Sequence, residues 1–287
     1  MDNCALCSSK KELEISHILP KFLFRYQKKS SPTGNIRTVN NPNRIVQDGL
    51  KLPFLCGECE DIFSKWETSF ANKIFYPYES GKVSNFIYDE SLSKFLASLS
   101  YRCLKLSQKE NQLDHIEPKL TKYVELALDN LQSYLLGRHE HPKEQRQHLV
   151  LLGPTTFPGG YIKGVKESDF NIYTTRAIEY DVISTDNEAF VYIKFLKFLV
   201  LCPIKIISNK GWRSSRISHS GGSIEPKLYE LNDYVLDRIL SGARLLPDNR
   251  GLLSSKQRDL IEKNLSKQDP DKLINSPLGK VMINNKN

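Results

Sequence analysis

The sequence lacks a long uninterrupted apolar run. Its longest apolar stretch, residues 195–207, is interrupted by Lys197 and Lys205, whereas a membrane-spanning helix needs about 20 consecutive apolar residues. The first residues also lack the basic and then apolar pattern of a secretory signal. We therefore expect a cytoplasmic protein with no membrane partner.

Extremes of composition are absent as well. Hydrophobic residues make up 39% of the 287 residues and charged residues 26%, which excludes wholesale disorder and allows a sizeable core. The 41 basic and 33 acidic residues give a net charge of +8. A charge of this size permits a polyanionic partner without requiring one.

The excess of basic residues is concentrated between residues 10 and 51, where nine Lys or Arg outnumber three acids. A solvated surface is one interpretation of this stretch, and a surface that contacts nucleic acid is the other. The candidate nucleic-acid-binding residues are Lys21, Arg25, Lys28, Lys29, Arg37 and Arg44.

Cysteine is scarce, with six residues in the chain, and a reducing compartment argues against disulfides. Four of the six form two matched pairs, Cys4-x-x-Cys7 and Cys56-x-x-Cys59. Two thiolates three positions apart converge on one side of a tetrahedron, and a second such pair closes it around zinc. A redox motif and coincidence are the less specific alternatives. The sequence therefore predicts a structural Cys4 zinc site.

The segment between and after these pairs has the pattern of short strands and helices. Apolar and polar residues alternate up to His17, which predicts a strand, and the apolar spacing after Glu60 predicts a helix with Phe63, Trp66 and Phe70 in the core. The expected elements are a strand at 13–17, a helix from Pro20, short strands at 36–39 and 44–47, a strand at 50–55 and a helix from Glu60.

Three motifs follow one another in a familiar order: Cys4-x-x-Cys7, then Ile-Ser-His17-Ile-Leu-Pro20, then Phe-Leu-Cys56-Gly-Glu-Cys59-Glu60. In this order and spacing the chain resembles the zinc-knuckle subgroup of the HNH endonucleases over residues 1–79. The resemblance implies a treble-clef-like zinc module that hydrolyses phosphodiester bonds in nucleic acid, with DNA favoured. It also implies a role in bacterial phage defence or restriction.

The resemblance also implies roles for individual residues. His17 matches the general base that activates water, and a single Mg²⁺ or Mn²⁺ ion would stabilise the developing charge. Three positions depart from the family: Ser16 stands where an Asp is usual, Lys51 where an Asn is usual, and Glu60 where a His or Asn is usual. Glu60, aided by Asp61, is the candidate ligand of the catalytic ion.

For these residues, non-catalytic roles stay open. His17 could instead be a packed histidine at the end of its strand, and Glu60 and Glu67 could belong to a solvated helix face. An asparagine is expected to orient His17 if it is catalytic, and nothing in the sequence selects among Asn40, Asn41 and Asn43.

Residues 80–266 are expected to form a second domain of mixed helices and antiparallel strands, followed by a polar, flexible tail at 267–287. Cys103 and Cys202 lie in apolar patterns and are interpreted as small buried residues, and His139, His141 and His148 as surface histidines. The expected helices are 91–108, 119–136, 228–243 and 254–266, and the expected strands are 148–152, 170–174, 177–184 and 189–207. Target recognition, self-association and docking to a partner protein are the roles left open for this region.

The sequence thus predicts an α+β protein: a treble-clef-like Cys4 zinc HNH module followed by a mixed helix and antiparallel-strand domain. The function we expect is metal-dependent endonuclease activity, with structural Zn²⁺ and catalytic Mg²⁺ or Mn²⁺. The alternatives are a non-catalytic zinc-stabilised module that binds nucleic acid or protein, and an effector controlled by a partner or a ligand.

Overall fold

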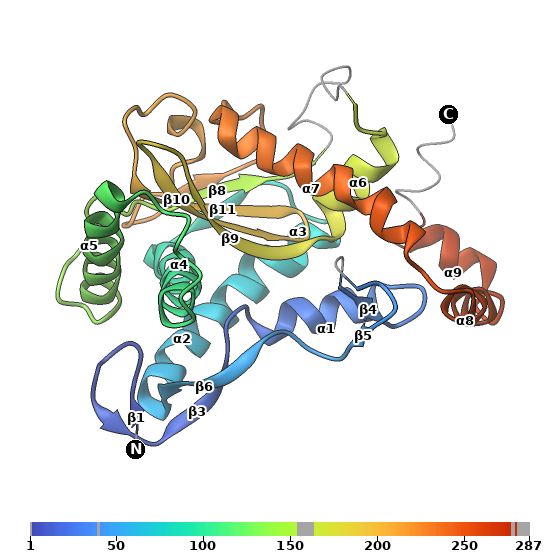
Figure 1. Ribbon diagram of the computed structural model, residues 1–287, viewed down its shortest axis with the longest axis horizontal. Coiled ribbons are helices and arrows are strands. Elements are labelled where there is room, and N and C mark those ends of the chain that lie inside the picture. Colours follow the sequence, from blue (N-terminus) through green and yellow to red (C-terminus); the bar gives the residue numbers. More distant parts are fainter. Residues whose placement is uncertain (1, 39–40, 154–163, 277–278, 280–287) are drawn as a thin grey trace.

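The computed structural model describes residues 2–38, 41–153, 164–276 and 279 (Figure 1). It is a mixed α and β structure whose paired strands are antiparallel throughout the described ranges. The strands are β1 (Asp2–Asn3), β2 (Lys10–Lys11), β3 (Leu13–His17), β4 (Ile36–Arg37), β5 (Ile45–Val46), β6 (Lys51–Cys56), β7 (Phe86–Tyr88), β8 (His148–Leu151), β9 (Ile178–Ser184), β10 (Ala189–Phe195), β11 (Phe198–Lys205) and β12 (Gly222–Ile224). The α-helices are α1 (Lys21–Lys29), α2 (Gly57–Phe70), α3 (Tyr76–Glu79), α4 (Glu90–Lys109), α5 (Pro118–Leu135), α6 (Glu167–Arg176), α7 (Asp233–Gly251), α8 (Ser255–Leu265) and α9 (Pro270–Asn275).

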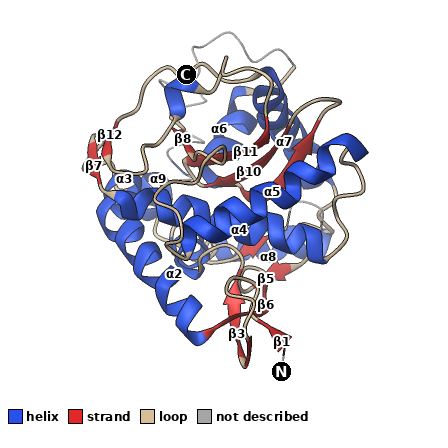
Figure 2. Ribbon diagram, turned by 90° about the vertical axis from the view of Figure 1, so that its left-hand side faces the viewer, coloured by secondary structure: helices blue, strands red, loops and turns tan. Residues whose placement is uncertain are grey.

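The N-terminal part is built around the pair β3–β6 and the helix that follows it. His17 is paired with Lys51 at one end of this ladder, and Leu13 with Cys56 at the other. Helix α2 begins directly after β6 and continues through a π-helical turn at Ala71–Phe75 into α3. Figure 2 shows β3 and β6 at the end of the molecule where the N-terminus lies. The predicted strand at 13–17 is confirmed, and so is the helix predicted from Glu60, which begins three residues earlier, at Gly57.

A four-stranded sheet in the order β8-β11-β10-β9 forms the centre of the second part. Side chains alternate along β10: Val191 and Ile193 pack with the core around α4 and α5, and Phe190 and Tyr192 pack with the core around α6 and α7. Figure 1 shows α4 and α7 on opposite sides of this sheet. Because both faces are covered, the central strands are apolar at nearly every position.

One predicted strand at 189–207 proves to be two strands, β10 and β11, joined by a tight turn at Leu196 and Lys197. Leu196 adopts a positive φ of 49°, which a leucine rarely does. Lys194 of β10 is fully buried. Its Nζ donates to the carbonyl oxygens of Leu196 and Ala177, and burial lowers its pKa to about 7.

Two further expectations for this region are wrong. Residues 170–174 lie in helix α6 and not in a strand, because Phe170, Tyr173 and Thr174 have helical spacing and pack toward the sheet and α7. His148 is not a surface histidine: it is 4% exposed, and its Nδ1 lies 3.1 Å from Ser215 Oγ. Cys103 and Cys202 are buried, as predicted.

One apolar core crosses residue 79, the expected boundary between the two parts. Phe70 of α2 stacks on Phe95 of α4 at 4.3 Å and meets Phe198 of β11 edge-on at 5.5 Å. Phe63 and Phe70 are buried and Trp66 is half-buried against them. The N-terminal part therefore draws much of its packing from the second part.

No helix in the described ranges has the length and apolar character that crossing a membrane requires. Within the polar segment 267–287, α9 is an ordered helix, and residues 277–278 and 280–287 lie outside the part described.

Candidate functional site

The four paired cysteines converge on one point, as predicted. Their Sγ atoms all lie within 4.8 Å of one another, and Cys7 Sγ is 3.8 Å from Cys56 Sγ. Four sulfurs arranged tetrahedrally about 2.3 Å from a zinc ion would be separated by about 3.8 Å. The cluster therefore fits a metal ion such as zinc.

Local backbone geometry brings the two pairs together. Cys4 and Cys7 lie in the turn between β1 and β2, which is closed by a hydrogen bond from the N–H of Cys4 to the carbonyl of Ser9. Cys56 ends β6 and donates its N–H to Cys4 Sγ at 3.3 Å, while Cys59 lies in the first turn of α2. The cluster thus ties the N-terminal hairpin to the junction of β6 and α2.

The surroundings of Cys7 favour its thiolate form, whereas those of Cys56 and Cys59 do not. Burial raises the pKa of the Cys7 thiol, but hydrogen bonds from Ser9, Cys4 and Cys56 outweigh burial and bring that pKa to about 6. Burial raises the pKa values of Cys56 and Cys59. A positive ion bound among the four sulfurs would favour the thiolate form of all of them.

The predicted base, His17, lies at the end of β3 and is held by a carboxylate. Its Nε2 lies 2.9 Å from Asp48 Oδ2, and the two side chains are 15% and 21% exposed. Asp48 also accepts the N–H of Gly49 at 2.9 Å. Burial raises the pKa of Asp48, but the hydrogen bonds from His17 and Gly49 and the nearby charge of Lys51 outweigh burial and lower it.

The ionised Asp48 carboxylate only accepts hydrogen bonds, so His17 Nε2 carries the proton and Nδ1 is left as the basic nitrogen. A carboxylate that fixes the orientation of an imidazole is common to histidines that act as general bases. The residue that orients His17 is therefore Asp48 and not one of the expected asparagines. Asn43 instead binds the start of α8, through Leu252 and Ser254, and Asn40 lies outside the described residues.

Ser16 and Glu60, two of the three departures from the HNH pattern, are in direct contact. Ser16 is fully buried, and its Oγ donates to Glu60 Oε2 at 2.8 Å. The same Oγ accepts the N–H of Leu55 at 3.3 Å. Glu60 is half-buried in the first turn of α2, where the positive end of the helix dipole favours a carboxylate. Asp61 is exposed beside it.

An ion pair between the buried Arg102 and the half-buried Glu67 lies beside His17, and the sequence did not predict it. Arg102 of α4 is 1% exposed; its Nη1 donates to the carbonyl of His17 at 2.8 Å, and its Nη2 lies 2.8 Å from Glu67 Oε1. Burial raises the pKa of Glu67, and the charge of Arg102 offsets only part of this. The sequence contained one indication of this ion pair: Arg102 lies between Tyr101 and Cys103, on the apolar face of a predicted helix.

Methionine in place of Arg102 is expected to destabilise the protein by about 2–4 kcal/mol, because it leaves a half-buried carboxylate and a part-buried carbonyl without their donor. Urea unfolding of the variant measures the loss. Adding Glu67→Gln to Arg102→Met should recover part of it, and the exposed Arg138→Met should change stability by no more than about 0.5 kcal/mol. A fully stable Arg102→Met would show that the pair carries no net stabilisation.

The six candidate nucleic-acid-binding residues divide into two groups. Lys28 donates to the carbonyl of Gln47, and Arg37 donates to the carbonyl of Pro42 and to Gln257 Oε1, so both are engaged within the protein. The remaining four are exposed on α1 and near β5: Lys21, Arg25, Lys29 and Arg44.

No protein-family model matches this chain, and neither does any curated protein or solved structure. In the described ranges, only the four cysteines bring three or more metal-ligating side chains together. Among the described residues, Glu60 thus has no second and third protein ligand beside it.

Proposed function

We propose that residues 1–79 form a zinc-bound, treble-clef-like module of the HNH type that hydrolyses phosphodiester bonds in nucleic acid, with DNA favoured. The observation that carries the proposal is the hydrogen bond between His17 and Asp48 at the end of β3. The order of parts also supports it: a hairpin with one cysteine pair, an antiparallel strand pair, and a helix whose start bears the second pair.

The four cysteines would hold a structural zinc ion and take no part in the reaction. Their role is to fix β6 and α2, the elements that carry Lys51 and Glu60, against the hairpin β1–β2. A structural site of this kind contributes folding free energy to a short segment with little core of its own.

In the proposed reaction, His17 Nδ1 takes a proton from a water molecule as the water oxygen bonds to phosphorus. The P–O bond opposite the entering oxygen breaks, and the leaving oxygen takes up a proton from solvent. Asp48 stabilises the imidazolium that forms, because its carboxylate is already in place against Nε2.

Mg²⁺ or Mn²⁺ would stabilise the charge that develops on the phosphate and the leaving oxygen. Glu60 is the candidate ligand in this chain, and its Oε2 is already oriented by Ser16. One carboxylate fits an ion that keeps most of its coordinated water, as Mg²⁺ commonly does. The exposed cations Lys21, Arg25, Lys29 and Arg44 would contact the phosphate backbone.

The experiment that tests this proposal is incubation of the zinc-loaded protein with plasmid, single-stranded DNA and RNA, each with Mg²⁺, Mn²⁺ or a chelator that spares the bound zinc. We expect cleavage of DNA that requires the added ion. Failure to cleave any substrate, by protein whose zinc content and melting curve are intact, would contradict it.

A second candidate function, a non-catalytic module that binds nucleic acid, is favoured by the lack of further metal ligands beside Glu60 in the described residues. Such a module would bind DNA with an affinity that falls steeply with salt and is unchanged by His17→Ala. Binding of this kind without cleavage would favour the second candidate.

A further inference from the structure

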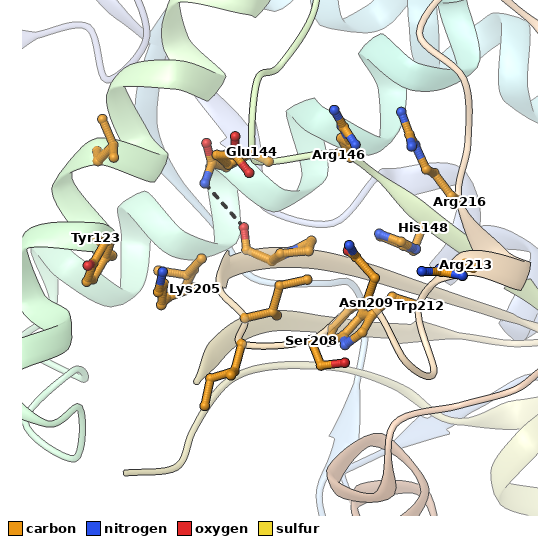
Figure 3. Close-up of a pocket in the computed structure, with 16 residues that line it drawn as sticks. Tyr123, Glu144, Arg146, His148, Lys205, Ser208, Asn209, Trp212, Arg213 and Arg216 are labelled. Carbon is orange, nitrogen blue, oxygen red and sulfur yellow. Dashed lines mark hydrogen bonds between the residues drawn. The ribbon is translucent and has the colours of Figure 1, made fainter. Parts of the chain in front are cut away.

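A pocket of about 450 Å³ lies in the second part of the chain, bordered by α5, the end of β11 and the segment that follows it. Its volume is within the range of small-molecule sites, about 300–1,000 Å³. The HNH-like residues take no part in it, and the proposed nuclease function does not require it. Figure 3 shows the side chains that line it.

Positive charge dominates one end of this pocket. Arg146, Arg213 and Arg216 line it, and all three also border a neighbouring pocket of about 550 Å³. In the part of the chain that the structure describes, none of the three forms an ion pair. Glu144 is the acid on the pocket wall, and it is exposed. Like charges gathered without carboxylate partners repel one another, so an anion placed among them would be stabilised.

Two buried side chains that are able to hydrogen-bond, His148 and Trp212, also line this pocket. His148 packs edge-on against Trp212 at 5.1 Å. Burial lowers the pKa of His148 to about 4, and the charges of Arg216 and Arg146 act in the same direction, so its ring is neutral at pH 7. Trp212 Nε1 is buried and has no hydrogen-bond partner among the described residues. An orphaned buried donor is typical of a place that an ordered water or ligand completes.

The other end of the pocket combines apolar and aromatic side chains with one lysine. Figure 3 shows Tyr123 and Lys205 there, away from Arg213 and Arg216, with Lys205 Nζ 4.9 Å from the centre of the Tyr123 ring. Leu126 and Ile207 on the wall are 47% and 69% exposed. Exposed apolar side chains beside an aromatic ring suit a flat, weakly polar group.

We propose that this pocket binds a nucleoside polyphosphate, with its phosphates among Arg146, Arg213 and Arg216 and its base against Leu126 and Ile207, beside Tyr123. The ligand must carry several negative charges and a flat ring system at once, because one pocket offers both kinds of surface. We favour a small ligand over a nucleic-acid duplex, because the three exposed arginines border pockets of about 450 and 550 Å³, volumes that suit a small molecule.

Isothermal titration calorimetry on the full chain tests the proposal with ATP, GTP, inorganic triphosphate and adenosine. We expect at least one nucleoside triphosphate to bind, inorganic triphosphate to bind more weakly, and adenosine to bind weakly or not at all. Arg213→Ala/Arg216→Ala should weaken the nucleotide at least about tenfold, and Arg146→Ala should weaken it as well. The matched control is Arg138→Ala, an exposed arginine outside the pocket, which should leave affinity unchanged.

Three results would overturn the proposal. The first is no binding of either nucleotide by protein with an intact melting curve. The second is nucleotide binding that survives the double arginine variant. The third is displacement of the nucleotide by a DNA duplex whose own binding depends equally on Arg213 and Arg216, which would make this surface a contact for nucleic acid.

Discussion

Serine replacement of both Cys56 and Cys59 is expected to abolish metal binding by the cluster and to unfold the N-terminal part of the chain. The cluster joins the hairpin β1–β2 to the junction of β6 and α2, and both cysteines are buried in the core. Structural zinc contributes about 10–16 kcal/mol in zinc-finger peptides. Since the core here extends to α4 and β11, we expect part of the second region to remain folded while the melting temperature falls steeply.

Zinc content per chain and a thermal melt measure this effect together. Cys103→Ala and Cys202→Ala are the matched controls, because each removes a buried sulfur outside the cluster. Both should keep the full zinc content while losing some stability to the cavity that is left. A Cys56→Ser/Cys59→Ser protein that keeps its zinc and its melting temperature would show that the cluster is not a metal site.

Alanine in place of His17 is expected to lower the rate of phosphodiester cleavage by about 10²–10⁴-fold, the usual contribution of a positioned general base. Asp48→Asn should also reduce kcat, because an amide can donate as well as accept and no longer favours a proton on Nε2. Neither change should remove zinc, since neither residue contacts the cysteines in the described structure.

Cleavage of a labelled oligonucleotide at several concentrations separates kcat from KM for these variants. His139→Ala is the matched control, because His139 is half-buried and lies outside the site. It should leave both parameters unchanged. A normal kcat for Asp48→Asn, with lost activity for His17→Ala, would mean that His17 acts without the orientation we assign to Asp48.

Local sequence signals predicted the N-terminal part well. The cysteine spacing, the alternation at 13–17 and the helical period after Glu60 each act over a few residues, and the cluster, β3 and α2 follow from them. The partners of His17 could not be found in this way. Asp48 is 31 positions from His17 and Arg102 is 85 positions away, so only the folded chain brings them together.

There are also physical reasons why the sequence did not predict some elements of the second part. The turn between β10 and β11 contains Leu196 and Lys197, without the Gly, Asn or Pro that usually identifies a turn. Both faces of these strands are buried, so the alternation that distinguishes an exposed face is missing. Residues 170–174 have aromatic and β-branched content typical of a strand, but their packing against α7 follows a helical period.

The contact between Ser16 and Glu60 gives the departures from the HNH pattern a common interpretation. The carboxylate expected on the strand at position 16 is replaced by a hydroxyl, while α2 supplies a carboxylate at position 60 that reaches the same place. We interpret Glu60 as the residue that supplies the negative charge for the proposed catalytic ion. Glu60→Gln keeps an acceptor for Ser16 and removes only the charge, so it tests this interpretation without disturbing the packing.

The most direct test of the proposed chemistry is cleavage of one DNA substrate by wild-type protein and by His17→Ala, at equal zinc content, with Mn²⁺ and with or without added imidazole. We expect wild-type protein to cleave, His17→Ala to be nearly inactive, and imidazole to restore part of the lost rate by replacing the missing base. Equal cleavage by both proteins, or no cleavage by the well-folded wild type, would contradict the assignment of His17 as a catalytic base.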